Sequence, residues 1–426
     1  MRRFRYDQPG FADAFTAFVS ERRETPEEVD TIVRDVLAAV RSEGVGALLR
    51  YALEFDRIEL TEATLLVSAD EIAEGAAKCS AEVRDAIAFA AERIRVYHER
   101  QRPADQRFTD SAGVELGWRW TPLEAVGIYV PGGRAAYPST VLMNAVPAKA
   151  AGVERIAMVT PPGRLQPAVL AAAQTAGVTE IWRVGGAQAV AALAYGAGPI
   201  RPVDKIVGPG NAFVTAAKRR VYGAVGIDAL AGPSEIVVVA DGANNPEWIA
   251  ADLLSQAEHD PAAQSILITD DEAFAAKVEA AIEAQLQVLA TGADARASWQ
   301  THGAVVIAPL DAAPGLVDEI APEHVEFAID EPERLSDRVR HAGAIFLGRH
   351  APEAIGDYVA GSNHVLPTSR AARFSSGLSL YDFLKRTSIV KCDARSFAAL
   401  APATIALAEA EGLPAHARSA AIRMGQ

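Results

Sequence analysis

Hydrophobic residues along the chain follow two different patterns in succession. In the first hundred residues they recur at intervals of three and four, which predicts amphipathic helices. One such run consists of Val29, Ile32, Val33, Val36, Leu37 and Val40. The segment Thr25-Pro26-Glu27-Glu28 offers a capping residue, a proline for the first helical position and two acids for the first turn, so we expect a helix to begin there. A second helical run covers residues 81–100. Residues 101–111 have the composition of a hinge.

From residue 124 onward, short apolar runs alternate with alanine-rich helical stretches. The first set of runs covers residues 126–130, 155–159, 179–184 and 205–207, and the alternation starts again at residues 235–240. Strands that alternate with helices indicate βαβ units and a parallel sheet. We therefore predict an α/β fold with two parallel-sheet modules in series. The last fifty residues are expected to be helical again.

Composition narrows the class of protein. The 426 residues carry a formal net charge of −14, which disfavours a general nucleic-acid binder or a partner of anionic membranes. Only two cysteines occur, Cys79 and Cys392, so a disulfide framework and a four-cysteine zinc site are excluded. No apolar run reaches the ~18 residues of a membrane helix, and no signal-peptide pattern follows the first residues. We expect a cytoplasmic enzyme.

Three glycine-containing turns follow predicted strands and open helices. They are Pro131-Gly132-Gly133, Gly185-Gly186 and Gly208-Pro209-Gly210-Asn211. Ligands of parallel sheets bind at the carboxyl ends of strands, where backbone N–H groups can meet a phosphate. Such turns are as frequent in α/β proteins without a nucleotide, and the last of them lacks the final glycine of G-x-G-x-x-G.

Several polar residues stand in patterns that suit catalysis or metal binding. Gln256 and His259 lie three residues apart near a predicted helix end, where they share one face and offer zinc donors, although a histidine is also favourable there without metal. Glu323 and His324 follow Pro322, and on a loop they could form a general base and a water-activating carboxylate, or belong to an ordinary turn. Asp357 could be an oxygen ligand or a helix-capping residue.

Eight strings in one order resemble the histidinol dehydrogenase family, over residues 27–423. They are Gly127-Ile128-Tyr129-Val130-Pro131-Gly132-Gly133, Val184-Gly185-Gly186-Ala187-Gln188-Ala189, Val203-Asp204-Lys205-Ile206-Val207-Gly208-Pro209-Gly210-Asn211, Ala231-Gly232-Pro233-Ser234-Glu235, Gln256-Ala257-Glu258-His259-Asp260, Pro322-Glu323-His324, Gly361-Ser362-Asn363-His364-Val365-Leu366-Pro367-Thr368 and Glu411-Gly412-Leu413-Pro414-Ala415-His416. Each string alone is modest evidence, but their shared order is specific.

The resemblance implies a zinc enzyme that oxidises L-histidinol to L-histidine through histidinal in two NAD-dependent steps, the last of histidine biosynthesis. It implies one Zn²⁺ per subunit, with ligands at Gln256, His259, Asp357 and His416. The catalytic pair falls on Glu323 and His324. Substrate contacts fall on Ser234, Gln256, His259, His324, Asp357, His364, Glu411 and His416. NAD contacts fall on Tyr129, Gln188 and Asn211.

The resemblance also implies two Rossmann-like but incomplete modules and a homodimer whose C-terminal tail completes the partner's site. We divide the chain into an N-terminal segment, a zinc and catalytic α/β domain, an NAD-side α/β domain and a helical tail. The corresponding ranges are 1–24, 25–125 with 235–375, 126–234 and 376–426. Alternative functions are a related dehydrogenase of another small alcohol such as sulfopropanediol, a zinc hydrolase, and a binding module without activity.

Overall fold

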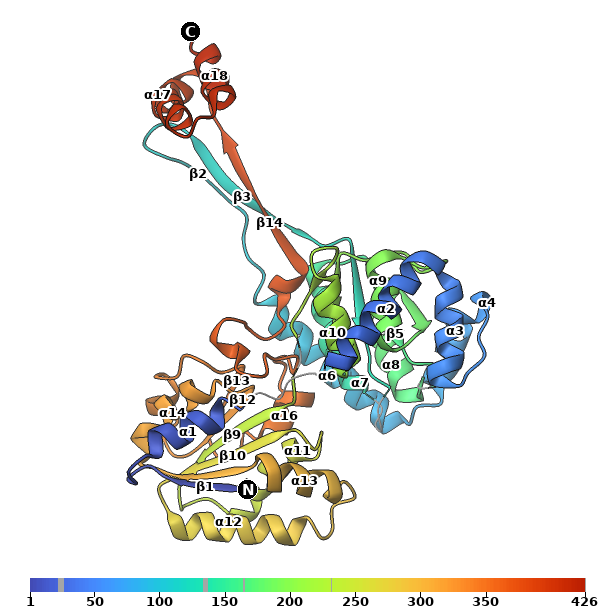
Figure 1. Cartoon of the computed structure of the whole chain (residues 1–426), viewed down its shortest axis with the longest axis vertical. Helices are drawn as coiled ribbons and strands as arrows, with labels where there is room; N and C mark the ends of the chain where they lie inside the picture. Colours follow the sequence, from blue (N-terminus) through green and yellow to red (C-terminus); the bar gives the residue numbers. More distant parts are fainter. Residues whose placement is uncertain (22–26, 133–136, 164, 231, 426) are drawn as a thin grey trace.

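Two parallel sheets and a projecting antiparallel arm form the protein in a computed structural model (Figure 1). The structure describes residues 1–21, 27–132, 137–163, 165–230 and 232–425. Thr25 and Pro26 of the predicted helix start, and Gly133 and Ala231 of two motifs, lie outside these ranges. The predicted α/β class with two parallel modules is confirmed.

The larger sheet has six parallel strands. In spatial order they are β1 (Arg2–Arg5), β11 (Ala304–Ile307), β10 (Gln264–Thr269), β9 (Glu235–Ala240), β12 (His324–Ala328) and β13 (Ala344–Leu347). Every residue of β9 is buried, as its unbroken apolar run predicts for a strand covered on both faces. The helices that cover this sheet are α1 (Phe11–Val19), α11 (Pro246–Ala257), α12 (Glu272–Gln285), α13 (Gly292–His302), α14 (Ala313–Ile320), α15 (Glu333–Ser336) and α16 (Glu353–Tyr358), with a short 3₁₀ turn η1 (Leu310–Ala312).

The smaller sheet has five parallel strands. In spatial order they are β6 (Glu180–Arg183), β5 (Arg155–Thr160), β4 (Ala125–Tyr129), β7 (Lys205–Val207) and β8 (Gly226–Ile227). One face packs against α5 (Ala69–Ala77), α6 (Ala81–Glu99), α7 (Pro138–Ala151) and α8 (Pro167–Ala176). The other face packs against α2 (Glu27–Glu43), α3 (Val45–Asp56), α4 (Glu62–Leu65), α9 (Gly186–Tyr195) and α10 (Ala212–Val221).

The packing of the N-terminal helices corrects one prediction. We assigned residues 25–125 to the same domain as residues 235–375, but α2 and α3 pack on the five-stranded sheet, with Val33 and Leu48 in its core. Ile87 and Ile94 of α6 enter the core on the opposite face of that sheet. An amphipathic helix shows that one of its faces is buried, and its sequence does not show against which sheet.

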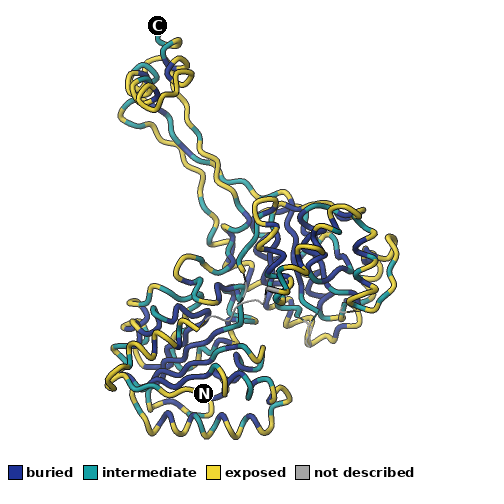
Figure 2. Tube along the Cα trace, in the orientation of Figure 1, coloured by how far each residue is buried: buried dark blue, intermediate teal, exposed yellow. Residues whose placement is uncertain are grey.

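The arm corrects two further predictions. The expected hinge at residues 101–111 contains β2 (Gln106–Thr109). The expected helical tail, residues 376–426, begins instead with the 3₁₀ turn η3 (Leu380–Phe383) and a long strand, β14 (Leu384–Lys391), and the 3₁₀ turn η2 (Ala371–Arg373) precedes it. Both strands pair antiparallel with β3 (Glu115–Pro122). At the far end, α17 (Ala394–Ala410) and α18 (Pro414–Arg423) pack on each other, away from both sheets (Figure 1). Figure 2 shows that the arm is mostly exposed, whereas both sheets are buried.

The strand order of each parallel sheet contains one reversal. In the smaller sheet the chain runs from β4 outward to β6 and returns to β7, beside β4. In the larger sheet it runs from β9 outward to β11 and returns to β12, beside β9. Such a reversal leaves a crevice outside the carboxyl ends of the strands, where α/β proteins bind ligands, and in the smaller sheet this crevice lies at the ends of β4 and β7. None of the helices in the described ranges combines the length and the apolar character that a membrane crossing requires.

Candidate active site

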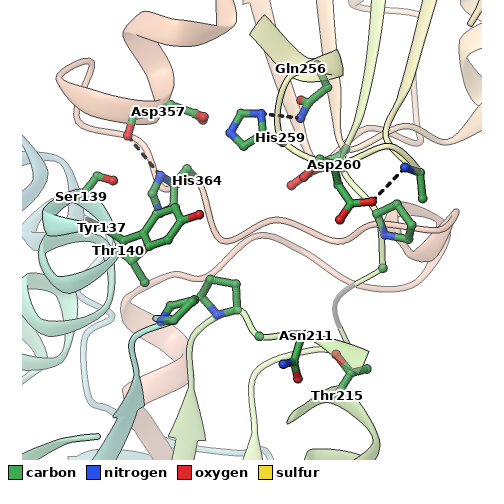
Figure 3. A pocket seen from close by; sticks show the side chains of 18 of the residues that line it. Tyr137, Ser139, Thr140, Asn211, Thr215, Gln256, His259, Asp260, Asp357 and His364 are labelled. Atoms are coloured by element: carbon green, nitrogen blue, oxygen red, sulfur yellow. Dashed lines mark hydrogen bonds between the residues drawn. The ribbon is translucent and has the colours of Figure 1, made fainter. Parts of the chain in front are cut away.

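A cavity of about 600 Å³ lies between the two sheets. The smaller sheet contributes residues at the carboxyl ends of β4 and β7, and the larger sheet contributes residues at the amino ends of β9 and β12. The cavity brings together eight of the predicted site residues, several of which are shown in Figure 3: Asn211, Ser234, Gln256, His259, Glu323, His324, Asp357 and His364. We call this cavity the catalytic cavity.

Buried backbone contacts hold the ring of His324 in one orientation. Its Nδ1 lies 3.1 Å from the carbonyl oxygen of Glu235, on the neighbouring strand, and therefore donates to it. The other ring nitrogen, Nε2, is buried without a hydrogen-bond partner in the described part of the chain and lies 3.6 Å from Asp357 Oδ1. Whenever the ring is neutral, its proton stays on Nδ1, so Nε2 is the nitrogen that can accept a proton as a general base.

Glu323 lies beside His324 at the start of the same strand. Its Oε2 accepts a hydrogen bond of 3.0 Å from the backbone N–H of Glu235 and lies 3.8 Å from His324 Nδ1. The two neighbouring residues therefore converge, as we predicted for a loop, although His324 is already the first residue of β12. Both side chains are buried, so their contacts take place in a low dielectric.

Burial and charge shift the pKa values of this pair. Burial raises the pKa of the Glu323 carboxyl to about 8. Burial alone would lower the pKa of His324, but the carboxylates of Glu323, Glu353 and Asp357 outweigh it and raise that pKa to about 10. Groups with strongly perturbed pKa values in a cleft are typical of active sites.

Gln256 and His259 offer metal donors at the end of α11. Gln256 Nε2 donates to His259 Nδ1 at 3.3 Å, while the buried Gln256 Oε1 has no hydrogen-bond partner among the residues that the structure describes. Asp357 lies near the carboxyl end of α16, so two helices direct their negative ends toward the cavity. Nitrogen and oxygen donors with an unpaired buried oxygen fit a zinc ion.

His364 faces the same cavity from the loop that follows α16 (Figure 3). Its Nδ1 donates to the backbone carbonyl oxygen of Asp357 at 3.1 Å. Burial lowers the pKa of its imidazole, so the neutral ring is favoured and its Nε2 can contact a ligand.

Sequence reasoning missed Glu353. His324, Glu353 and Asp357 each have one potential ligand atom, and these three atoms lie within 4.8 Å of one another. Glu353 and Asp357 stand four residues apart in α16, a spacing that places both carboxylates on one helical face and could have identified Glu353.

A second cavity of about 830 Å³ adjoins the first and is lined by all three predicted NAD contacts. Tyr129 ends β4, Gln188 belongs to the first turn of α9, and Asn211 caps α10 and lines both cavities. The Tyr129 hydroxyl accepts a 3.0 Å hydrogen bond from the N–H of Gly186, at the positive end of α9. This size and lining suit a dinucleotide, and we call it the cofactor cavity.

Sequence reasoning also missed the ion pair that supports the turn between the cavities. Lys218 and Asp228 are both buried and form an ion pair. Lys218 Nζ donates to the carbonyl oxygen of Gly208 at 3.0 Å, and the N–H of Gly208 donates to Asp228 Oδ2 at 2.7 Å. Gly208 has φ +107°, and a Cβ there would lie 2.3 Å from Tyr129 O. Both backbone polar groups of Gly208, its N–H and its carbonyl oxygen, are therefore hydrogen-bonded, and these two bonds fix the turn that leads to Asn211.

Two predicted site residues do not reach the catalytic cavity of their own chain. Glu411 follows α17, and His416 lies in α18, at the tip of the arm (Figure 1). Both side chains are exposed. The catalytic cavity of one chain thus contains three of the four predicted zinc ligands and lacks His416 of that chain.

The chain is similar to known proteins along nearly its whole length. The sequence matches the histidinol dehydrogenase family profile over residues 19–424. It is 77% identical to the histidinol dehydrogenase of Caulobacter vibrioides over 424 residues, which covers 100% of this chain and 99% of that protein. It is 60% identical to the enzyme of Mesorhizobium japonicum, covering 99% of this chain and 98% of that protein. The crystal structure of histidinol dehydrogenase from Elizabethkingia anophelis has a TM-score of 0.94 at 36% identity, covering 100% of this chain and 98% of that one.

Proposed function

The chain belongs to the histidinol dehydrogenase family of NAD-dependent oxidoreductases in histidine biosynthesis, and we propose that its catalytic cavity oxidises L-histidinol to L-histidine. This assignment depends most on one observation. Asn211 lines both cavities, so the cavity that contains His324 opens beside the cavity that contains Tyr129 and Gln188. An alcohol in the first cavity and a nicotinamide in the second would meet at their common wall.

The first oxidation needs a base, and His324 is suited to that role. Its Nε2 accepts the hydroxyl proton of histidinol while the carbon of the alcohol loses a hydride to NAD, which yields the aldehyde. The backbone contact to Glu235 keeps the ring oriented throughout, because Nδ1 stays bonded to the carbonyl oxygen. Ser234 and His364 line the cavity, and we infer that they contact the substrate there.

The second oxidation needs a water molecule, which Glu323 activates. Its carboxylate accepts a proton from water as the water oxygen bonds to the aldehyde carbon. With the proton that it took in the first oxidation, His324 protonates the aldehyde oxygen as the water adds, which gives the neutral hydrate. The hydrate then loses a hydride to a second NAD, one proton to His324 and one proton to solvent, and a carboxylate remains. Burial raises the pKa of the Glu323 carboxyl, so its carboxylate is a stronger base than an exposed one when it accepts this proton.

Gln256, His259 and Asp357 are the residues that would hold zinc in this chain. Their donor atoms, the unpaired buried Gln256 Oε1 and the two helix carboxyl ends all favour a cation at this position. A zinc ion held by these residues would supply a Lewis acid for the nitrogen donors of the substrate, and its charge would offset the carboxylate charge that raises the pKa of His324.

The fourth ligand of this zinc site is His416 of the partner subunit, and Glu411 of the partner subunit contacts the substrate. The arm carries α17 and α18 away from their own sheets (Figure 1), and its tip exposes Leu400, Leu407, Leu413 and Ile422. Exposed apolar side chains at the end of a projecting element are typical of an interface. We therefore infer a homodimer in which each arm reaches the cavity of the other chain.

The stoichiometry of the reaction tests the proposed function. Zinc-loaded protein is incubated with L-histidinol and NAD, and the NADH and histidine formed are both counted. Two NADH per histidine is the expected result. Turnover of another small alcohol, such as sulfopropanediol, without any NADH from histidinol would overturn the substrate assignment.

A further inference from the structure

The wall of the cofactor cavity contains an acidic residue, Asp56. Among the described residues that line this cavity, Asp56 is the only charged one. The N-terminal helices and the loop after α3 contribute an apolar wall to the same cavity, formed by Ile32, Val36, Phe55 and Ile58. The cavity is assigned to a dinucleotide that itself carries negative phosphates, so a lone acid there requires an explanation.

The end of α3 brings Asp56 to this wall. Asp56 is the last residue of the helix, and Arg57 caps it in the left-handed conformation with φ 59°. The N–H groups of Arg57 and Ile58 both bond to the carbonyl oxygen of Ala52, the latter at 3.2 Å. A Cβ at Gly163 would lie 3.2 Å from Ile58 Cδ1, so this turn closes against the turn that follows β5. Asp56 is therefore held at the cavity by a formed turn.

Asp56 has no partner in the described ranges of the chain. No hydrogen bond or ion pair joins its carboxylate to any of these residues, although burial raises its pKa. A half-buried carboxylate without a donor is unfavourable, and a ligand that supplies hydroxyl donors would relieve that cost. The charge of Asp56 also adds to burial in raising the pKa of Tyr129 to about 12, so the two groups face the same region.

We propose that Asp56 binds the ribose hydroxyls of the adenosine half of NAD and thereby selects NAD against NADP. This inference rests on the proposed function, in which NAD occupies the cofactor cavity. The nicotinamide must lie at the wall that the cofactor cavity shares with the catalytic cavity, where Asn211 is found. Asp56 lines only the cofactor cavity and not the catalytic cavity, so it lies on the side left for the adenosine half. The apolar residues beside Asp56 suit the flat adenine ring.

The chemistry of the two cofactors explains the selection. A carboxylate accepts hydrogen bonds from both ribose hydroxyls of NAD, and such bonds to a charged group are among the stronger ones in proteins. In NADP the 2′-hydroxyl is replaced by a phosphate that carries a charge of about −1.5 to −2 at neutral pH. Two negative groups in contact in a partly buried cavity repel each other, so NADP is excluded.

The test compares the cofactor preference of three variants with that of the unaltered protein. Asp56→Asn removes the charge and keeps the shape, and Asp56→Ser removes most of the side chain. Glu54→Gln is the matched control, because Glu54 is an exposed acid of the same helix and does not line the cavity. The measured quantity is kcat/KM for NAD divided by kcat/KM for NADP, with L-histidinol saturating, together with Tm.

We expect the ratio to fall about 100-fold in both Asp56 variants, about tenfold from weaker NAD binding and about tenfold from relieved repulsion of NADP. Glu54→Gln should keep the original ratio. An unchanged ratio in both Asp56 variants, with unchanged Tm, would overturn the assignment of Asp56.

Gln188→Ala separates this failure from failure of the cofactor cavity itself. If Gln188→Ala weakens NAD binding, only the role of Asp56 is wrong; if it does not, NAD binds elsewhere and both proposals fall.

Discussion

His324 Nδ1 lies 3.1 Å from the backbone carbonyl oxygen of Glu235, and this contact leaves the opposite nitrogen of the ring facing Asp357 and the catalytic cavity. A backbone acceptor cannot be removed by substitution at Glu235, so the orientation depends on the pairing of β9 with β12. The position of the base is therefore a property of the six-stranded sheet.

His324→Gln should remove the base without unfolding the protein. We expect kcat for histidinol to fall by about 10²–10⁴-fold, the usual contribution of a general base, with Tm nearly unchanged. The measurement is steady-state NADH formation at saturating NAD. A variant that keeps more than a tenth of the original kcat would show that another group accepts the proton.

Glu323→Gln should act mainly on the second oxidation. The amide can still accept the hydrogen bond from the N–H of Glu235, so the local fold is retained, but it cannot take a proton from water. With histidinal as the substrate, we expect NADH formation to fall by about 10²–10⁴-fold. If the rate with histidinal were unaffected, Glu323 would have no part in activating water.

Asp357→Asn should lower the zinc content of the purified protein and, with it, the activity. An amide oxygen is a weaker ligand for zinc than a carboxylate, and one negative charge is lost beside the cation. Metal analysis after dialysis measures this directly. Glu258→Gln is the control, because Glu258 lies next to His259 in sequence but is hydrogen-bonded to Thr291. Equal zinc in both variants would remove Asp357 from the ligand set.

Seven strands of the two sheets, β4, β5, β6, β7, β9, β10 and β11, could be predicted from the sequence, whereas β1, β8, β12 and β13 and the packing partners of the N-terminal helices could not. The run from Val29 to Val40 marks a buried face of α2, but the five-stranded sheet becomes its partner only through contacts with α9 and α10, more than a hundred residues away. Local periodicity does not contain that information.

The arm was missed for a related reason. β2 is exposed along its whole length and β14 nearly so, so neither strand shows the alternation of buried and exposed residues that identifies a strand. The residues of the catalytic cavity, by contrast, were found because their chemical types stand in specific strings. Lys218 and Asp228 stand in no such string, and only the fold brings them together.

Asp228→Asn should destabilise the protein and weaken NAD binding together. The substitution leaves Lys218 buried beside a neutral group, and breaking a buried ion pair from one side costs about 3–5 kcal/mol of the free energy of unfolding. The double variant Lys218→Met with Asp228→Leu removes both charges and should recover much of that stability. It should not recover NAD affinity, because Gly208 loses both partners that fix the turn before Asn211. Denaturant unfolding and NAD titration measure the two effects. Full recovery of both would show that the pair has no role in positioning the turn.

A pair of acidic residues, the half-buried Asp252 and the buried Glu326, predicts how stability depends on pH. Burial raises the pKa of Asp252 to about 6, and burial together with the charge of Asp252 raises the pKa of Glu326 well above its usual range. A carboxyl whose pKa is higher in the folded than in the unfolded state stabilises the fold at low pH, and this contribution is lost as pH rises through the folded value. We therefore expect Tm to decrease as the pH rises from 4 to about 6, where Asp252 ionises, and to decrease again at higher pH, where Glu326 ionises. Glu326→Gln should make the decrease of Tm with pH smaller. Equal slopes of Tm against pH for the variant and the unaltered protein would contradict this expectation.

Activity in mixed dimers tests most directly whether one chain supplies the base and the other supplies the last zinc ligand. Subunits with His324→Gln and subunits with His416→Ala are each prepared alone, then unfolded and refolded together. In a mixed dimer, one site contains both substitutions and the other contains neither. We predict that each parent is nearly inactive and that the mixture regains about a quarter of the original activity, as random pairing gives half mixed dimers with one intact site each. A mixture no more active than its parents, although mixed dimers have formed, would contradict a shared catalytic site.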